Sequence, residues 1–444
     1  MRDTKVSRRR LLTLGGATLA AGTLGGGSYA AASGRLLQSV GPAQAPARKT
    51  VHLAGTDGWV AVPAPANPTS YDFPDNLAPE GKTTYVFGFR DVTGYSDQQV
   101  QDQKGKTQIC APLLWFDEYQ SALANDVQVT VTNLGMQVRP DLTDGHTLHW
   151  HGFRNATPFY DGVPEMSVSI PIGRDLTYFY QPKDPGTYMY HCHFEDVEHV
   201  QMGMTGPLFV RPRQNGTVHA GFNKFAYNDG DGSTGYDREY ALLLTEMYLE
   251  SHWQDAHIQQ PLWDQYHADA WFINGRSYPD TLAPSTGFYG PTGSRPTGVA
   301  VGDPNPWPNP RVAAPPRLSH QPLSSLVSCN AGDRVLLRLA NLGYQEHAMT
   351  VPGLVLDVIG KDATLLANGA VKTSMQTETI SIGPGESYDC IFTAPTVSQP
   401  TTYVLYNRAY ATSQNRDQQG IGGMRTEIRV HPAGTLPAQT APNA

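Results

Sequence analysis

The fold of this chain is decided by residues 187–204, which read Thr-Tyr-Met-Tyr-His-Cys-His-Phe-Glu-Asp-Val-Glu-His-Val-Gln-Met-Gly-Met. The beginning of this stretch lines up with residues 402–408, Thr-Tyr-Val-Leu-Tyr-Asn-Arg, in the second part of the chain. Residues 125–135 and 332–343 form another similar pair, since both alternate apolar with polar residues and both end in Asn-Leu-Gly. Repeats of this kind indicate a duplicated unit. The sequence therefore predicts an all-β protein made of two copies of one Greek-key β-sandwich.

The composition agrees with short strands joined by many turns. Charged residues make up only 16% of the chain, and 44 Gly and 35 Pro among 444 residues disfavour long amphipathic helices. The length suffices for at least two compact domains. We expect a first sandwich over residues 34–212, a Gly-rich linker over 213–236, a second sandwich over 237–433 and a tail over 434–444.

Residues 1–33 have the character of an export signal. Ser-Arg-Arg-Arg-Leu-Leu at residues 7–12 precedes a Gly- and Ala-rich apolar stretch, and the alanines at 30–32 offer a cleavage site. This pattern resembles a twin-arginine signal, and the apolar stretch is too short and too rich in glycine for a membrane anchor. We expect a periplasmic or secreted protein without stable membrane insertion. Because Lys and Arg form no cluster beyond this segment, we expect no nucleic-acid partner.

The cysteines fall into two groups. Cys192 stands between two histidines, whereas Cys110, Cys329 and Cys390 lie in apolar, strand-like stretches. In an oxidising compartment Cys329 and Cys390 could form a disulfide, and buried free thiols are equally consistent with their surroundings.

The opening stretch and residues 146–152, His-Thr-Leu-His-Trp-His-Gly, together contain a set of metal ligands. One thiolate, two imidazoles and a distant thioether suit a blue-copper centre, in which Cys and two His form a trigonal set and a Met is axial. A structural zinc site is disfavoured by the single cysteine and the methionine. The predicted ligands are His146, Cys192, His199 and Met204, with Met202 as the less suitable axial ligand.

Strand alternation predicts a second copper centre beside the first. When Cys192 faces the blue copper, its two neighbours in an extended strand face away from it. His149 and His151 share one face by the same rule. The predicted ligands of the second centre are His149, His151, His191 and His193. Electrons would pass from one centre to the other through Cys192 and its flanking peptides.

These motifs resemble the multicopper oxidase family, which includes laccases. Residues 161–173, Asp-Gly-Val-Pro-Glu-Met-Ser-Val-Ser-Ile-Pro-Ile-Gly, are also similar to that family's Asp-Gly stretch. The resemblance implies cupredoxin-like domains, a small-molecule (phenolic) or metal-ion electron donor, and reduction of dioxygen to water at a trinuclear copper cluster held by eight histidines. It also implies that Asp161 assists proton delivery, although an aspartate that only begins a turn is an equal alternative.

The chain departs from the family pattern in two ways. The spacing from Cys192 to His199 is longer than in ordinary laccases and in that respect leans toward copper nitrite reductases. The second repeat also has Tyr406, Asn407 and Arg408 where the first has His-Cys-His. His347-Ala-Met takes the place of His149-Trp-His, which leaves His347 as the remaining candidate ligand of that repeat.

Four or five cluster histidines per chain leave several readings open. A homo-oligomer or another ligand-bearing protein would complete the cluster, or the second centre is smaller than trinuclear. A nitrite reductase-like enzyme is one alternative, although His149 stands where that family uses an aspartate and His193 is a ligand it does not need. A copper-binding or electron-transfer protein without turnover is another.

Overall fold

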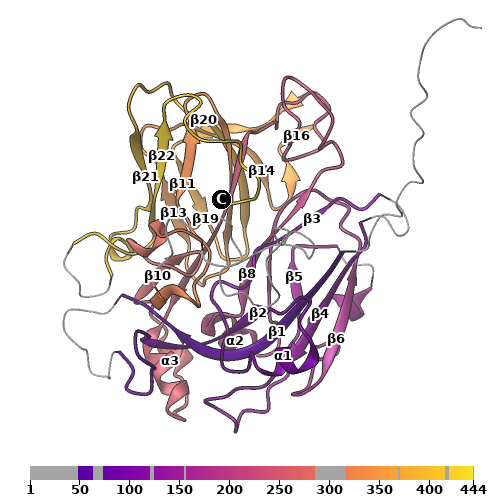
Figure 1. Ribbon diagram of the computed structural model, residues 1–444, viewed down its shortest axis with the longest axis vertical. Coiled ribbons are helices and arrows are strands. Elements are labelled where there is room, and N and C mark those ends of the chain that lie inside the picture. Colours follow the sequence, from indigo (N-terminus) through magenta and orange to yellow (C-terminus); the bar gives the residue numbers. More distant parts are fainter. Residues whose placement is uncertain are drawn as a thin grey trace, which may run out of the picture. The chain divides into compact units, whose positions relative to one another are not determined.

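The computed structural model describes residues 49–63, 74–120, 125–154, 157–285, 316–368, 371–415 and 420–443. Residues 45–444 form one compact unit. Strands dominate this unit, which confirms the predicted all-β class (Figure 1). The predicted export signal at residues 1–33 lies outside the described residues and stays a prediction. No helix in the described part of the chain is long and apolar enough to cross a membrane.

The first half, residues 49–211, contains two four-stranded sheets. Their orders are β2-β1-β4-β6 and β3-β8-β7-β5, and in each sheet one pair of strands is parallel. The strands are β1 (Lys49–Val60), β2 (Thr84–Asp91), β3 (Leu114–Asp117), β4 (Val127–Asn133), β5 (His149–His151), β6 (Asp175–Tyr180), β7 (Gly186–His191) and β8 (Thr205–Arg211). The apolar residues at alternate positions of β4 are fully buried, as their period predicts.

The second half, residues 238–443, repeats this plan with more strands. One sheet has the order β10-β9-β12-β20-β14-β15 with β18 paired to β14, and the other has the order β11-β22-β21-β13-β19. The strands are β9 (Arg238–Met247), β10 (Ala270–Ile273), β11 (Val327–Asn330), β12 (Arg334–Asn341), β13 (His347–Thr350), β14 (Leu356–Lys361), β15 (Thr364–Leu365), β16 (Ala367–Asn368), β17 (Val371–Lys372), β18 (Met375–Thr377), β19 (Thr379–Ile382), β20 (Ser387–Thr393), β21 (Thr401–Asn407) and β22 (Arg425–His431).

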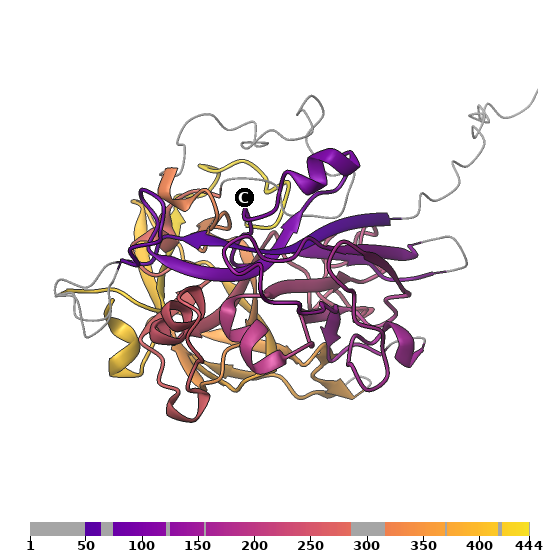
Figure 2. The same cartoon turned by 90° about the horizontal axis from the view of Figure 1, so that it is seen from below.

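Helices are few and short. The α-helices are α1 (Asp97–Gln101), α2 (Asp196–Met202) and α3 (Leu249–Ala256), and the 3-10 turns are η2 (Pro158–Tyr160), η3 (Trp263–Gln265), η4 (Asp280–Leu282), η5 (Pro316–Leu318) and η6 (Tyr410–Ser413). Figure 2 shows the strands of the first half, in indigo and magenta, beside those of the second half, which run from rose through orange to yellow. The boundaries that we predicted for the two sandwiches and the linker stay a proposal.

Equivalent side chains perform the same task in both halves. Asn133 at the end of β4 donates to the carbonyl of Ile170 (2.8 Å) and accepts from the amide of Gly135 (2.8 Å). Asn341 at the end of β12 donates to the carbonyl of Ile382 (3.0 Å) and accepts from the amide of Gly343 (2.9 Å). The shared Asn-Leu-Gly motif therefore closes the same turn twice.

All four cysteines are buried free thiols. Cys329 lies on β11 and Cys390 on β20, which belong to different sheets. Of the two possibilities left open by the sequence, the structure contains the free thiols and not the disulfide.

Candidate metal centres

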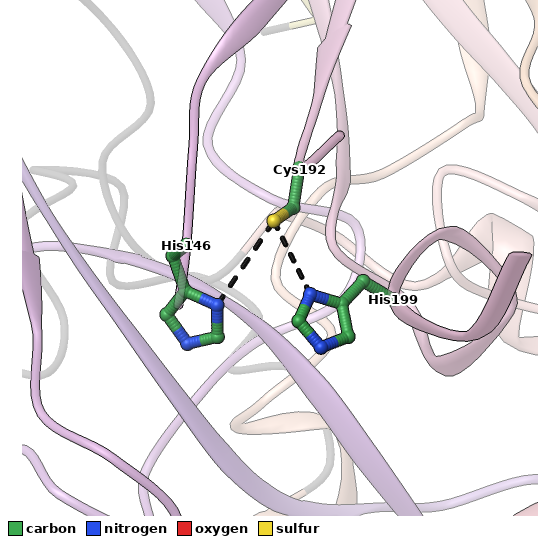
Figure 3. A group of neighbouring side chains, drawn as sticks. All are labelled: His146, Cys192 and His199. Carbon is green, nitrogen blue, oxygen red and sulfur yellow. Dashed lines mark hydrogen bonds between the residues drawn. The ribbon is translucent and has the colours of Figure 1, made fainter. Parts of the chain in front are cut away.

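The thiol group of Cys192 and two imidazoles of the first half converge (Figure 3). The Cys192 sulfur lies 3.2 Å from Nδ1 of His199 and 3.9 Å from Nδ1 of His146. Cys192 directly follows β7, His146 forms a bridge to Ile170, and His199 belongs to α2. All three side chains are fully buried. Elements far apart in the sequence thus bring one thiol and two Nδ1 atoms together.

The imidazoles of His146 and His199 favour the thiolate form of Cys192. Burial alone would raise the pKa of the Cys192 thiol, but the charge of His199 and hydrogen bonds with both imidazoles outweigh burial and hold that pKa well below its ordinary value. A thiolate flanked by imidazoles is the form that binds a metal ion. A soft sulfur donor with two nitrogen donors in a closed, apolar site fits copper.

Two methionines are close in sequence to His199 and are candidates for the axial ligand. Met202 and Met204 are both fully buried in the same apolar cluster as Cys192. The main chain of Met204 is tied to two candidate ligands, because its amide donates to the His199 carbonyl (2.9 Å) and its carbonyl accepts from the Cys192 amide (3.1 Å). The assignment of Met204 as the axial ligand stays a prediction.

Four histidine rings form a second group on the other side of Cys192. Donor atoms of His149, His151 and His191 all lie within 4.8 Å of one another. The ring of His193 is 5.2 Å from that of His149 and 5.4 Å from that of His191, centre to centre. The structure therefore brings together the four histidines predicted for the second centre, and we call them the histidine patch.

Trp150 explains why β5 presents its two histidines to the patch. Its ring is fully buried and stacks on Tyr180 with a centroid separation of 3.9 Å, which fixes Trp150 toward the core. Because neighbouring residues of a strand point to opposite faces, His149 and His151 must face the other way. Opposite them on β7 lies His191, which pairs with His149 across the ladder.

Main-chain carbonyls orient two rings of the patch. Nδ1 of His149 lies 2.6 Å from the carbonyl of Asp161, and Nδ1 of His191 lies 2.9 Å from the carbonyl of Cys192. These contacts leave Nε2 of each ring free to bind a metal ion. Burial lowers the pKa of His149 and His151, and lowers that of His191 to about 3, so the rings are neutral, as ligands must be.

Asp161 lies at the edge of the patch. It follows η2, and a carboxylate oxygen stands 3.7 Å from Nδ1 of His149 with about a third of its side chain exposed (31%). The residue thus connects solvent with the patch, and its part in proton delivery stays a proposal.

His347 does not lie at the patch. It is fully buried in the second half, where Nε2 contacts a carboxylate oxygen of Glu246 (3.0 Å) and Nδ1 accepts from the amide of Asn407 (2.8 Å). Both ring nitrogens therefore have partners away from the patch. The group of donor atoms at the patch contains no residue of the second half among those the structure describes.

The strand registers correct our alignment of His347. Thr350 pairs with Tyr406 as His149 pairs with His191, so Thr350 takes the place of His149 and His347 takes the place of His146. The error has a simple cause, because the segment between Asn341 and His347 is shorter than the one between Asn133 and His146.

Contacts outside the motifs also shape both groups, and the sequence carries no local signal for them. A carboxylate oxygen of Asp144 lies 3.8 Å from Nε2 of His199. A side chain at Gly55 would place its Cβ 2.6 Å from the His146 ring, and one at Gly385 would place it 2.8 Å from Nε2 of His151. Gly385 belongs to the second half, so His151 lies against that half.

A duplicated β-sandwich with a thiolate–imidazole group beside a histidine patch defines a copper protein with two kinds of site. Two family models, both described as multicopper oxidase, match residues 122–215 and 238–428. The chain therefore belongs to the multicopper oxidase family, and copper is the metal that this membership implies.

Curated relatives and solved structures agree with this family. The chain is 26% identical to Laccase-1 of Cryptococcus neoformans over 274 residues, which cover 58% of this chain and 34% of that protein. It is 34% identical to Multicopper oxidase MCE of Talaromyces pinophilus over 110 residues, 24% of this chain and 16% of that protein. The chain thus spans about a third of the first of these relatives and 16% of the second.

Two solved structures cover nearly the whole chain. The blue copper oxidase of Nitrosomonas europaea has a TM-score of 0.56 and 22% identity over 86% of each chain. The multicopper oxidase mgLAC has a TM-score of 0.56 and 21% identity over 89% of each chain. These similarities confirm the predicted cupredoxin-like fold.

Proposed function

We propose that this protein is a laccase-like copper oxidase. A small-molecule donor, phenolic or a metal ion, would give single electrons at the Cys192 group, and dioxygen would be reduced to water at the histidine patch. The observation that carries the proposal is the position of Cys192 in one group with His191 and His193, its direct neighbours, in the other. Copper held by the two groups would supply reversible one-electron transfer and the open coordination positions that dioxygen needs.

The chain itself provides the connection between the two groups. The Cys192 carbonyl accepts a hydrogen bond from the His191 ring, and the amide of His193 donates to the hydroxyl of Thr147 (3.0 Å). These bonds hold the His-Cys-His segment in one conformation. A rigid, short covalent path favours electron transfer between its ends, because little has to move when charge passes.

Protons must reach the patch together with electrons. We propose that Asp161 delivers them, because its carboxylate is partly exposed and stands 3.7 Å from Nδ1 of His149. The main-chain carbonyl of Asp161 also orients the His149 ring through its contact with Nδ1. Positioning and proton delivery would then belong to the same residue.

Electron donors would approach the other group from the side of Asp144. The His199 ring is buried, and Asp144, whose side chain is 16% exposed, stands 3.8 Å from its Nε2. A donor that docks at this carboxylate would lie close to the ring without entering a deep cavity.

We further propose that a second copy of the chain completes the patch. Four imidazoles are fewer than the eight that the family's trinuclear cluster takes, and His347 is occupied by Glu246 and Asn407. A homo-oligomer that brings another chain's histidines to the patch would supply the rest.

Export is the remaining part of the proposal. The twin-arginine pattern at residues 7–12 would direct the folded protein to the periplasm or the exterior. Arg8→Lys combined with Arg9→Lys should leave the protein in the cytoplasm, whereas Lys5→Arg should not change its location. Unchanged export of the double variant would reject this pattern as the signal.

Copper analysis and oxygen uptake test the proposed activity. The copper-loaded protein should contain more than one copper per chain and consume dioxygen when a phenolic donor is added. Reduction of nitrite without oxygen uptake would favour the nitrite reductase-like alternative, which the long Cys192–His199 spacing suggests. One copper per chain with neither activity would identify an electron carrier.

A further inference from the structure

Helix α2 carries one of the blue-copper ligands and owes little of its stability to its own sequence. It has seven residues, and Glu195 precedes it in the left-handed region (φ 48) without a capping hydrogen bond from its side chain. A left-handed Gly203 ends the helix, but a helix of seven residues without an N-cap side chain is unstable on its own. His199 sits in the middle of this helix, so the position of its ring depends on whatever holds α2.

Gln201 attaches α2 to the second half. Its side chain is 4% exposed and joins two main-chain groups there. The amide nitrogen donates to the carbonyl of Glu246 (2.7 Å), and the amide oxygen accepts from the amide of Tyr248 (3.3 Å). A buried side chain with both of its polar ends satisfied is costly to replace.

Tyr344 makes a second attachment, in which the donor belongs to the second half. This residue follows β12, and its hydroxyl donates to the carbonyls of Val197 and Asp196 in α2. The second half therefore holds α2 near both ends, on either side of His199.

Both attachments rest on Glu246. Its carboxylate accepts from the amides of Tyr344 and Gln345, from the hydroxyl of Tyr266 (3.2 Å) and from His347. Asn407 in turn holds His347. Glu246 is 2% exposed, so these bonds fix a carboxylate that would otherwise be costly to bury.

The residues behind Glu246 stand where the first half has copper ligands. His347 corresponds to His146 and Asn407 to Cys192 through the registers described above, and Met424 precedes β22 as Met204 precedes β8. The Asn407 amide lies 2.8 Å from His347 and 3.7 Å from the Met424 sulfur. In the second half a hydrogen-bonded amide thus occupies the place of the thiolate.

We propose that the second half positions the blue-copper ligand His199 through Gln201 and Tyr344. His347 and Asn407, which correspond to ligands of the first half, buttress Glu246. Glu246 supports the two attachments, and the attachments hold α2 so that the His199 ring faces Cys192. The inference rests on the proposed function and assigns positioning roles to residues that touch neither copper nor substrate.

Gln201→Met tests the proposal, with Gln321→Met as the matched control. Methionine keeps the length of the side chain and loses both hydrogen bonds. Gln321 is also buried (1%) and joins two main-chain groups that are not part of α2, accepting from Ala61 (2.9 Å) and donating to Gly275 (2.8 Å). Both variants should lose a similar amount of stability.

Two measurements on the full chain separate positioning from stability. In the metal-free protein, Gln201→Met should raise the hydrogen-exchange rate of the α2 amides about fivefold or more, as expected for the loss of buried hydrogen bonds. In the copper-loaded protein, it should change the copper hyperfine splitting and the reduction potential of the blue site. Gln321→Met should do neither. If Gln201→Met does not fold, Tyr344→Phe with Tyr240→Phe as its control provides the same comparison.

The outcomes distinguish this inference from the proposed function. A wild type without blue colour would reject the blue-copper function, while the exchange measurement would still decide whether the second half holds α2. A blue wild type whose Gln201→Met and Gln321→Met variants behave alike in both measurements would overturn the positioning role alone.

Discussion

At the scale of single residues, the spacing of ligands was the strongest signal. Cys192 and the histidines on either side were assignable because alternation along a strand decides which face each side chain takes. The contacts of Asp144 with His199 and of Gly55 with His146 were not, because they join segments far apart in the sequence. The sequence around Asp144 or Gly55 therefore does not predict these contacts.

Replacement of the thiol should abolish the blue colour. In Cys192→Ser the sulfur that supplies the charge-transfer band is absent, while a hydroxyl of similar size keeps the packing. The visible spectrum of the copper-loaded variant should lack the intense band, and its circular dichroism should match that of the wild type. Cys390→Ser, in the second half, should remain blue. A blue Cys192→Ser variant would contradict the assignment.

The two methionines should respond differently to the same change. Met204→Leu should keep the colour and raise the reduction potential. The thioether is a weak donor that stabilises the oxidised copper, and leucine removes this stabilisation. Met202→Leu should leave the potential unchanged. Redox titration of both variants decides the matter, and the opposite pattern would make Met202 the axial ligand.

Gly55 should be required for the orientation of the His146 ring. A Cβ at this position would lie 2.6 Å from the ring, closer than unstrained contacts allow. Gly55→Ala should therefore alter the blue spectrum and lower the free energy of unfolding by about 1–3 kcal/mol. Gly383→Ala is the control, since its Cβ would meet Glu386 at an ordinary 3.5 Å. Equal behaviour of the two variants would show that the site tolerates the shift.

At the scale of elements, periodicity predicted strands but not α2. The strand β4 follows an apolar period of two, which its burial reproduces. Helix α2 has few residues and no capping side chain, and it is joined to the second half by a hydrogen bond from Gln201 to Glu246 and by one from Tyr344 to Val197. The longer Cys192–His199 spacing was visible in the sequence, whereas the helix that it forms was not.

Helix α3 should make the stability of the metal-free protein depend on pH. His252 in α3 is fully buried, its Nδ1 lies 2.6 Å from the carbonyl of Tyr85, and burial lowers its pKa to about 4. Below pH ~6.5 His252 is protonated in the unfolded chain but stays neutral in the folded chain. The free energy of unfolding therefore decreases as the pH falls toward about 4. The loss approaches about 3 kcal/mol.

Urea unfolding between pH 7 and 4 measures this effect. His252→Gln, which retains a polar group for Tyr85 but does not titrate, should show a smaller loss over that range than the wild type. His267→Gln is the control at an exposed position of the same half. Identical pH dependence of the wild type and His252→Gln would contradict the account.

At the scale of the whole molecule, the sequence predicts the duplication but not every pair of equivalent residues in the two halves. The sequence alignment of Cys192 with Asn407 agrees with a different pair of registers, because Tyr406 pairs with Arg425 as His191 pairs with Thr205 and a methionine precedes each partner. His347 was misplaced because the loop before it differs in length between the halves. Only the paired strands reveal that it corresponds to His146 and that it serves Glu246.

The two halves are therefore similar in fold and different in task. The first half presents the thiolate group and the histidine patch, and the second half holds α2 and lies against His151 through Gly385. A copy of the unit that lacks the ligand residues can therefore still contribute to the site.

Reoxidation of the bleached protein by dioxygen tests the central claim most directly. The wild type, reduced by a phenolic donor without oxygen until its colour disappears, should turn blue again within the dead time of mixing with dioxygen. His193→Ala, which alters the patch and not the Cys192 group, should bleach equally well and stay colourless after mixing. A variant that regains its colour as fast as the wild type would show that electrons reach dioxygen without the histidine patch.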